Sequence, residues 1–144
     1  MILRRLAILF SVLGLIISSY ALYLHFRPLG DSWCDLSTAF SCDLVNKGPW
    51  SEIFGVPVAF FGIPGYSLLL ILALFRPKNW RLMFLMAAVL GTAFSLYLTY
   101  LEAFVIFAWC IICLGSLITI ISLGLIGLLL HRDLVKKTNL DPKR

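Results

Sequence analysis

The chain has 144 residues, of which 61% are hydrophobic and 13% are charged, and its mean hydropathy is +0.99. Soluble domains contain about 45–50% apolar residues, so this composition excludes an ordinary soluble domain and indicates a protein embedded in a lipid bilayer. The formal net charge of +5 comes from the two ends and short loops, without the basic stripe between aromatic residues that a nucleic-acid-binding face requires. The length predicts a single domain over residues 1–144.

The first apolar span is predicted over residues 6–26, directly after Arg4 and Arg5. About 20 residues of this kind cross the hydrocarbon core of a bilayer. Ser19-Tyr20-Ala21 resembles the cleavage site of a signal peptide, but the apolar run continues past it and exceeds the roughly 7–15 residues of a signal core. We therefore expect the segment to remain as the first helix.

Residues 27–56 form a polar loop that is rich in turn-forming residues and contains Cys34 and Cys42. The stretch from Asp35 to Cys42 is compatible with one or two helical turns. Several residues are too apolar for a freely solvated loop: Trp33, Phe40, Trp50, Ile53 and Phe54. We therefore expect the loop to lie against the membrane surface and to cap the helices.

Three further spans follow this loop. The second is predicted over residues 57–75, and a basic link over 76–81 separates it from 49 residues, Leu82 to Leu130, that carry a single charge. As one helix at about 1.5 Å per residue, this run would be more than twice as long as a membrane is thick, so it must fold back. Equal division predicts helices over about 82–107 and 110–130, followed by a basic tail over 131–144.

The predicted fold is thus an all-α integral membrane protein, a bundle of four transmembrane helices. Its orientation follows from the positive-inside rule. Two basic residues, Arg27 and Lys47, fall on one side. Ten fall on the other: Arg4, Arg5, Arg76, Lys78, Arg81, Arg132, Lys136, Lys137, Lys143 and Arg144. We expect both termini to be cytoplasmic, and the loop and all four cysteines to face outward.

The strongest chemical motif is Trp109-Cys110-Ile111-Ile112-Cys113, a C-x-x-C pair at the start of the last helix. Residues three apart share a helix face, and their Cα atoms lie within the roughly 4.4–6.8 Å that a disulfide requires. The helix N-terminus favours a thiolate, whereas apolar surroundings oppose it. This spacing indicates a redox-active dithiol.

The loop pair has a different spacing. In a straight helix Cys34 and Cys42 would have Cα atoms about 12 Å apart, too far for a disulfide. Either the loop turns between them, or each thiol exchanges with a different partner. A zinc site is disfavoured because neither pair has the short-knuckle context of such sites, so we expect no metal.

The combined pattern resembles the vitamin K epoxide reductase family. The resemblance rests on Cys34-Asp-Leu-Ser-Thr-Ala-Phe-Ser-Cys42, Trp50-Ser-Glu-Ile-Phe-Gly-Val-Pro57, Ser95-Leu-Tyr97 and Phe107-Ala-Trp-Cys110-Ile-Ile-Cys113, in order and spacing over nearly the whole chain. It implies a four-helix bundle around a quinone of the ubiquinone, menaquinone or vitamin K type. It also implies that Cys113 faces the quinone, that Cys110 exchanges with Cys42, and that Cys34 takes electrons from a thioredoxin-like protein. The implied location is the bacterial cytoplasmic membrane, or the endoplasmic reticulum in a eukaryote.

Three positions depart from the animal members of that family. Val58 and Leu117 stand where those proteins offer an asparagine and a tyrosine to the quinone oxygens, and Gly48 replaces a loop serine. These departures favour quinone reduction coupled to disulfide formation over epoxide reduction. Candidate quinone contacts are Trp50, Val58, Phe61, Glu102 and Leu117.

Glu102 is an ionisable residue within an apolar span, which makes it a functional candidate. Its position near the outer helix end is also compatible with a side chain that reaches the membrane surface, or with a neutral, hydrogen-bonded carboxyl group. Two function classes remain open for the chain. One is an enzyme that oxidises protein dithiols and reduces a quinone, and the other is a non-enzymatic membrane protein with structural disulfides.

Overall fold

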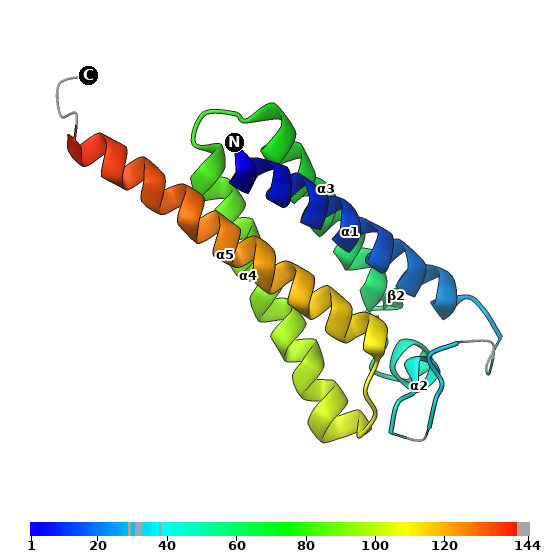
Figure 1. Cartoon of the computed structure of the whole chain (residues 1–144). Coiled ribbons are helices and arrows are strands. Elements are labelled where there is room, and N and C mark those ends of the chain that lie inside the picture. Colours follow the sequence, from blue (N-terminus) through cyan, green and yellow to red (C-terminus); the bar gives the residue numbers. More distant parts are fainter. Residues whose placement is uncertain (29, 31–32, 38, 141–144) are drawn as a thin grey trace.

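A computed structural model of the chain describes residues 1–28, 30, 33–37 and 39–140 (Figure 1). The elements in chain order are α1 (Ile2–His25), α2 (Cys42–Lys47), β1 (Glu52–Ile53), β2 (Val56–Pro57), α3 (Val58–Phe75), α4 (Trp80–Leu101), a π-helix η1 (Glu102–Ile106) and α5 (Ile111–Leu140). Within the described residues, four segments are long and apolar enough to cross a membrane: Ile2–His25, Val58–Phe75, Trp80–Ile106 and Ile111–Asp133. The prediction of four membrane-spanning helices is confirmed.

The four long helices pack as a closed ring. α1 and α4 each contact both α3 and α5. Figure 1 shows the helices side by side, with the loop after α1 and the α4–α5 connection at one end of the bundle, and the N-terminus and the α3–α4 connection at the other. The loop and the C-x-x-C pair therefore meet at the same end, although which side of the membrane this end faces stays a prediction.

Close approach of α1 and α3 depends on small residues, as is usual between helices in a membrane. A Cβ atom added to Gly14 of α1 would lie 2.2 Å from the Tyr66 ring of α3, and one added to Gly62 would lie 2.3 Å from the Ser18 hydroxyl oxygen. Tyr66 also belongs to the main hydrophobic core, which includes the large side chains of Leu69, Phe84 and Leu123.

Two sequence predictions about local structure are wrong. The last helix does not end near residue 130 but continues to Leu140, because no proline or glycine follows Gly127 until Pro142. Between Asp35 and Ser41 none of the described residues is helical, whereas one or two helical turns were expected there. Ser37 and Phe40 instead form an isolated bridge, and α2 begins at Cys42. Lys143 and Arg144 of the predicted basic tail lie outside the described residues.

A short hairpin leads from the loop into α3. β1 and β2 are antiparallel, and their turn residues Phe54 and Gly55 both have positive φ, 54° and 78°, as a type I′ turn requires. At the end of α1, Nδ1 of His25 contacts the backbone oxygen of Asn46, and Nε2 lies 3.3 Å from the Glu52 carboxylate. His25 thus ties α1 to α2 and to the hairpin.

The α1–α3 contact predicts opposite effects for two glycine substitutions. Gly14→Ala forces its methyl group against the Tyr66 ring, so it should lower the free energy of unfolding by about 1–3 kcal/mol. Gly65→Ala in α3 is the matched control, because nothing lies within 4 Å of its Cβ position and alanine is the better helix former. Thermal unfolding in detergent measures both. Equal midpoints for the two variants would contradict the close packing.

Candidate functional site

A disulfide joins the two loop cysteines. Cys34 and Cys42 are bonded, with their Cα atoms 5.8 Å apart, and both side chains are fully buried. The chain reverses between them through the backbone hydrogen bonds of Ser37 and Phe40. Of the two alternatives left open by the spacing, the loop therefore turns between its cysteines.

The polar residues around Cys42 fix the start of α2. The Ser41 hydroxyl accepts the Leu44 N–H at 3.2 Å as the helix N-cap, and donates to Asp35 Oδ1 at 2.6 Å. At the other end, Lys47 pairs with Asp43 at 2.6 Å. Side-chain caps of this kind typically contribute about 1 kcal/mol, so a six-residue helix is held with Cys42 as its first residue.

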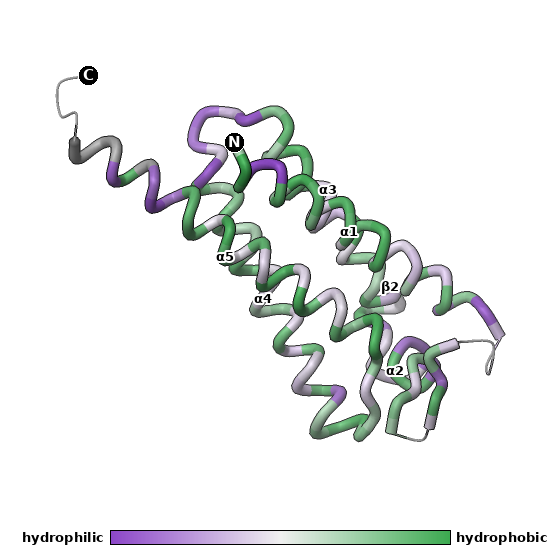
Figure 2. Tube along the Cα trace, in the orientation of Figure 1, coloured by the Kyte–Doolittle hydropathy of each residue, from purple (hydrophilic) through white to green (hydrophobic). Residues whose placement is uncertain are grey.

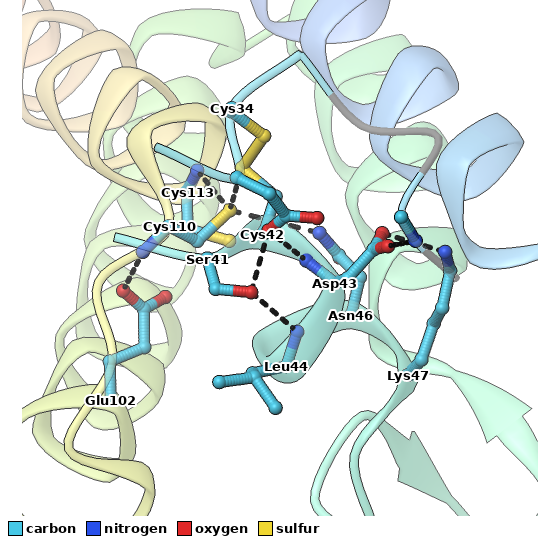
Figure 3. The surroundings of a disulfide bond; sticks show 12 residues. Cys34, Ser41, Cys42, Asp43, Leu44, Asn46, Lys47, Glu102, Cys110 and Cys113 are labelled. Carbon is cyan, nitrogen blue, oxygen red and sulfur yellow. Dashed lines mark hydrogen bonds and ion pairs between the residues drawn. A yellow bond between two sulfur atoms is a disulfide. The ribbon is translucent and has the colours of Figure 1, made fainter. Parts of the chain in front are cut away.

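The α4–α5 connection brings the second cysteine pair to the loop. The Trp109 N–H donates to the Ala39 carbonyl at 2.8 Å, and Phe40 and Trp109 form a parallel bridge. As a result, Cys110 Sγ lies 3.5 Å from Cys42 Sγ (Figure 3). Two sulfur atoms that are 68 residues apart in sequence are thus in contact.

Cys110 and Cys113 are free thiols in this structure and have different surroundings. Cys110 is fully buried and lies directly before α5. Its sulfur accepts hydrogen bonds from the Cys113 N–H at 3.3 Å and from the Asn46 side-chain amide at 3.7 Å (Figure 3). These two hydrogen bonds hold Cys110 Sγ beside the loop disulfide.

Glu102, the first residue of η1 directly after α4, forms a hydrogen bond with the backbone of the same cysteine. Its side chain is 2% exposed, and Oε2 accepts the Cys110 N–H at 3.1 Å. Its backbone oxygen accepts the N–H of Ala108 at 3.3 Å. The side chain therefore does not extend to the membrane surface. It satisfies a backbone donor at the N-terminus of α5, where an acidic group is favourable.

A cavity of about 510 Å³ opens beside Cys113, between the four long helices and α2. Cys113 lines it, whereas Cys110 does not. Four of the five predicted quinone contacts line it as well: Trp50, Val58, Phe61 and Glu102. Leu117 does not, because the face of α5 toward the cavity follows Cys113, Ser116 and Ile120, at the i, i+3, i+7 spacing of one helix face.

Sequence reasoning did not single out several polar residues of the cavity, among them Asn46, Tyr66 and Ser116. Asn46 lies one turn after Cys42 on α2, so a correct prediction of this short helix would have placed it on the same face. Tyr66 of α3 and Ser116 of α5 bond through their hydroxyl groups at 2.9 Å, and both line the cavity. The sequence feature that could have indicated Tyr66 and Ser116 is a hydroxyl group inside an otherwise apolar span.

Metal ligation has no support among the residues that the structure describes, because no three of its His, Cys, Asp and Glu side chains come together as a ligand group. The cysteines instead occur as one disulfide and two thiols.

The Glu102 contact predicts that its role depends on an acceptor oxygen. Glu102→Gln keeps such an oxygen and should leave the free energy of unfolding nearly unchanged. Glu102→Leu leaves the Cys110 N–H unsatisfied in a buried place and should cost about 1–3 kcal/mol. Thermal unfolding of the two purified variants measures the difference. Equal losses in both would show that the charge, rather than the hydrogen bond, is what the fold requires.

Comparisons with known proteins agree with this geometry. A family model described as the vitamin K epoxide reductase family matches residues 5–128. The chain is similar to vitamin K epoxide reductase complex subunit 1 of Rattus norvegicus, 28% identical over 129 residues that cover 78% of this chain and 80% of the rat protein. The same subunit of Mus musculus is 28% identical over 120 residues, with 72% and 74% covered.

The matched region includes both cysteine pairs, the loop between α1 and α3, and the cavity beside Cys113. It also spans most of each of the four apolar helices. The chain is a multi-pass membrane protein that belongs to the vitamin K epoxide reductase family, a family of oxidoreductases.

Proposed function

We propose that this protein forms disulfides by passing electrons from a thioredoxin-like dithiol protein through its two cysteine pairs to a quinone. The observation that carries the proposal is the 3.5 Å contact between Cys110 Sγ and Cys42 Sγ, together with the position of Cys113 at the cavity. The loop pair, Cys34 and Cys42, exchanges electrons with the partner protein. The Cys110–Cys113 pair adjoins a cavity that is large enough for a small molecule.

The loop step transfers two electrons inward. A thiolate of the partner attacks Cys34 of the loop disulfide and releases Cys42, and the second thiol of the partner then resolves the mixed disulfide. The partner becomes oxidised and the loop cysteines become thiols. Cys34 is fully buried in the disulfide state, so the loop must open for the partner to reach this sulfur.

The internal step returns the loop to its oxidised form. Cys42 attacks Cys110 of an oxidised Cys110–Cys113 pair and releases the Cys113 thiolate. Cys34 then attacks Cys42, restores the loop disulfide and releases Cys110. The Asn46 amide and the Cys113 N–H stabilise charge on the departing Cys110 sulfur. The described state, with a loop disulfide and two free thiols, corresponds to the end of this step.

The last step takes place at the cavity. A quinone accepts two electrons and two protons to become a hydroquinone. Cys113 supplies the electron pair, because it is the cysteine that lines the cavity, and Cys110 then bonds to Cys113 to reform the disulfide. The Tyr66–Ser116 hydroxyl pair lines the same space and can donate a hydrogen bond to a ring oxygen, in place of the polar groups absent at Val58 and Leu117.

A second candidate function is reduction of vitamin K epoxide itself. It is favoured by the similarity to the rat and mouse vitamin K epoxide reductase complex subunit 1. Purified protein supplied with a dithiol and either a quinone or vitamin K epoxide distinguishes the two. Turnover of the quinone alone supports the proposal, turnover of the epoxide supports the alternative, and turnover of neither supports a non-enzymatic protein with a structural disulfide.

The relay predicts that Cys34→Ala blocks turnover with a protein dithiol, because the partner then lacks its point of attack. A Cys42–Cys110 bridge should accumulate and be detectable by mass spectrometry of unreduced peptides. Dithiothreitol, which is small, should bypass much of the block. Ser37→Ala, in the same loop, is the control and should behave as wild type. If Cys34→Ala oxidises the protein dithiol as fast as wild type, the loop pair is not a shuttle.

The quinone step predicts that Cys113→Ala reduces quinone only at the background rate of a protein-free assay, whatever reductant is supplied. Ile118→Ala, on the exposed outer face of α5, is the control and should retain activity. Cys110→Ala should leave the Cys113 thiolate unpaired beside the ring and give a long-wavelength charge-transfer band, which acid bleaches by protonating the thiolate. The double variant Cys110→Ala with Cys113→Ala should show no band. Quinone reduction retained in Cys113→Ala would return the pair to a structural role.

A further inference from the structure

The end of the bundle opposite the cysteines contains a second hollow, of about 670 Å³. Figure 2 shows hydrophilic segments at this end, near the N-terminus, along the α3–α4 connection and in α5 before its last turns. The residues around the hollow come from all of these segments: Met1, Leu3, Arg4, Arg76, Trp80, Arg81, Leu130, Asp133 and Lys136. Neither the redox chemistry nor the apolar cavity involves this end.

The charge of the hollow is strongly unbalanced. Among the described residues, four cationic side chains line it, those of Arg4, Arg76, Arg81 and Lys136, against one carboxylate, that of Asp133. Among the described residues no ion pair joins Asp133 to any of these cations. Like charges around one space repel each other and attract an anion that lies between them, so an anionic group in the hollow would be stabilised.

Two of the cations are held in place by the fold. Arg4 Nε donates to the Ala73 carbonyl of α3 at 3.0 Å, and Arg81 Nη1 donates to the Leu130 carbonyl of α5 at 3.3 Å. Each guanidinium keeps further N–H groups for a ligand. The side chains of Arg76 and Lys136 make no hydrogen bond or ion pair with another described residue, so no described carboxylate neutralises their charges.

We infer that this hollow binds the headgroup of an anionic phospholipid. It lies at the ends of four membrane-spanning segments, the depth at which lipid headgroups lie, and basic pockets between helices at this depth recognise such headgroups. The Trp80 ring, 5.8 Å from the Arg81 guanidinium carbon, has the interfacial position that tryptophan prefers in membranes. Leu3 and Leu130 add apolar surface for the first acyl carbons, which a free phosphate ion would leave unused.

The positive-inside rule also concentrates basic residues on one side of a membrane protein, without any binding site. Two other arginines at this end distinguish that explanation from a headgroup site. Arg5 and Arg132 are exposed at the same end of the bundle but do not line the hollow. If diffuse surface charge attracted the lipid, Arg5 and Arg132 would contribute to binding as much as Arg76 and Lys136. If the hollow binds the headgroup, Arg5 and Arg132 would not contribute.

The test uses native mass spectrometry of the full chain in a non-ionic detergent, with equimolar phosphatidylglycerol and phosphatidylcholine added. Wild type should retain phosphatidylglycerol preferentially. The double variant Arg76→Gln with Lys136→Gln should lose this preference at least about fivefold, whereas Arg5→Gln with Arg132→Gln should keep it. Arg76→Lys with Lys136→Arg preserves the charges and should also keep it, which separates lost charge from misfolding.

Three outcomes would overturn the inference: no preference in wild type, an equal loss in the two glutamine pairs, or displacement of the lipid by excess inorganic phosphate with no remaining selectivity for phosphatidylglycerol. The last outcome would make the hollow a site for free phosphate. None of these results depends on quinone reduction, so the lipid site and the redox relay are tested separately.

Discussion

The structure depends on one contact, between Cys110 Sγ and Cys42 Sγ at 3.5 Å. These atoms belong to segments 68 residues apart, so a network of backbone hydrogen bonds must hold the loop against the α4–α5 connection. The Trp109 N–H donates to the Ala39 carbonyl, and the Glu102 carboxylate accepts the Cys110 N–H. Both sulfur atoms are buried in one cluster with Leu24 and Ile112, at the contact distance that the proposed exchange between them requires.

The same constraint explains why the loop is compact. A bridge between Cys34 and Cys42 forces the chain to reverse within seven intervening residues, and α2 begins at the second cysteine. The N-cap of that short helix, Ser41, is the residue directly before Cys42. Local helix capping and the redox geometry are therefore set by the same few residues, and they place Asn46 one turn further on, beside Cys110.

The two ends of the bundle differ in their electrostatics. At the cysteine end, charged and polar side chains contact one another, as in the His25–Glu52 and Lys47–Asp43 contacts, and the lining of the cavity between the ends is mainly apolar. At the opposite end, arginine and lysine side chains surround a hollow whose described lining contains one carboxylate, that of Asp133. The proposed sulfur chemistry and the proposed lipid site therefore lie in surroundings of different charge.

The four spans, the C-x-x-C pair and the grouping of the cysteines at one end were predictable from sequence, because hydropathy, spacing and the distribution of Lys and Arg are local properties of the chain. The sequence did not determine that Cys34 and Cys42 are bonded, that α2 starts at Cys42, or that Glu102 accepts the Cys110 N–H. Nor did it distinguish Val58 and Phe61, which line the cavity, from Leu117, which does not. The tertiary structure decided these points, because each depends on how far one helix is rotated and how closely a distant segment packs against it.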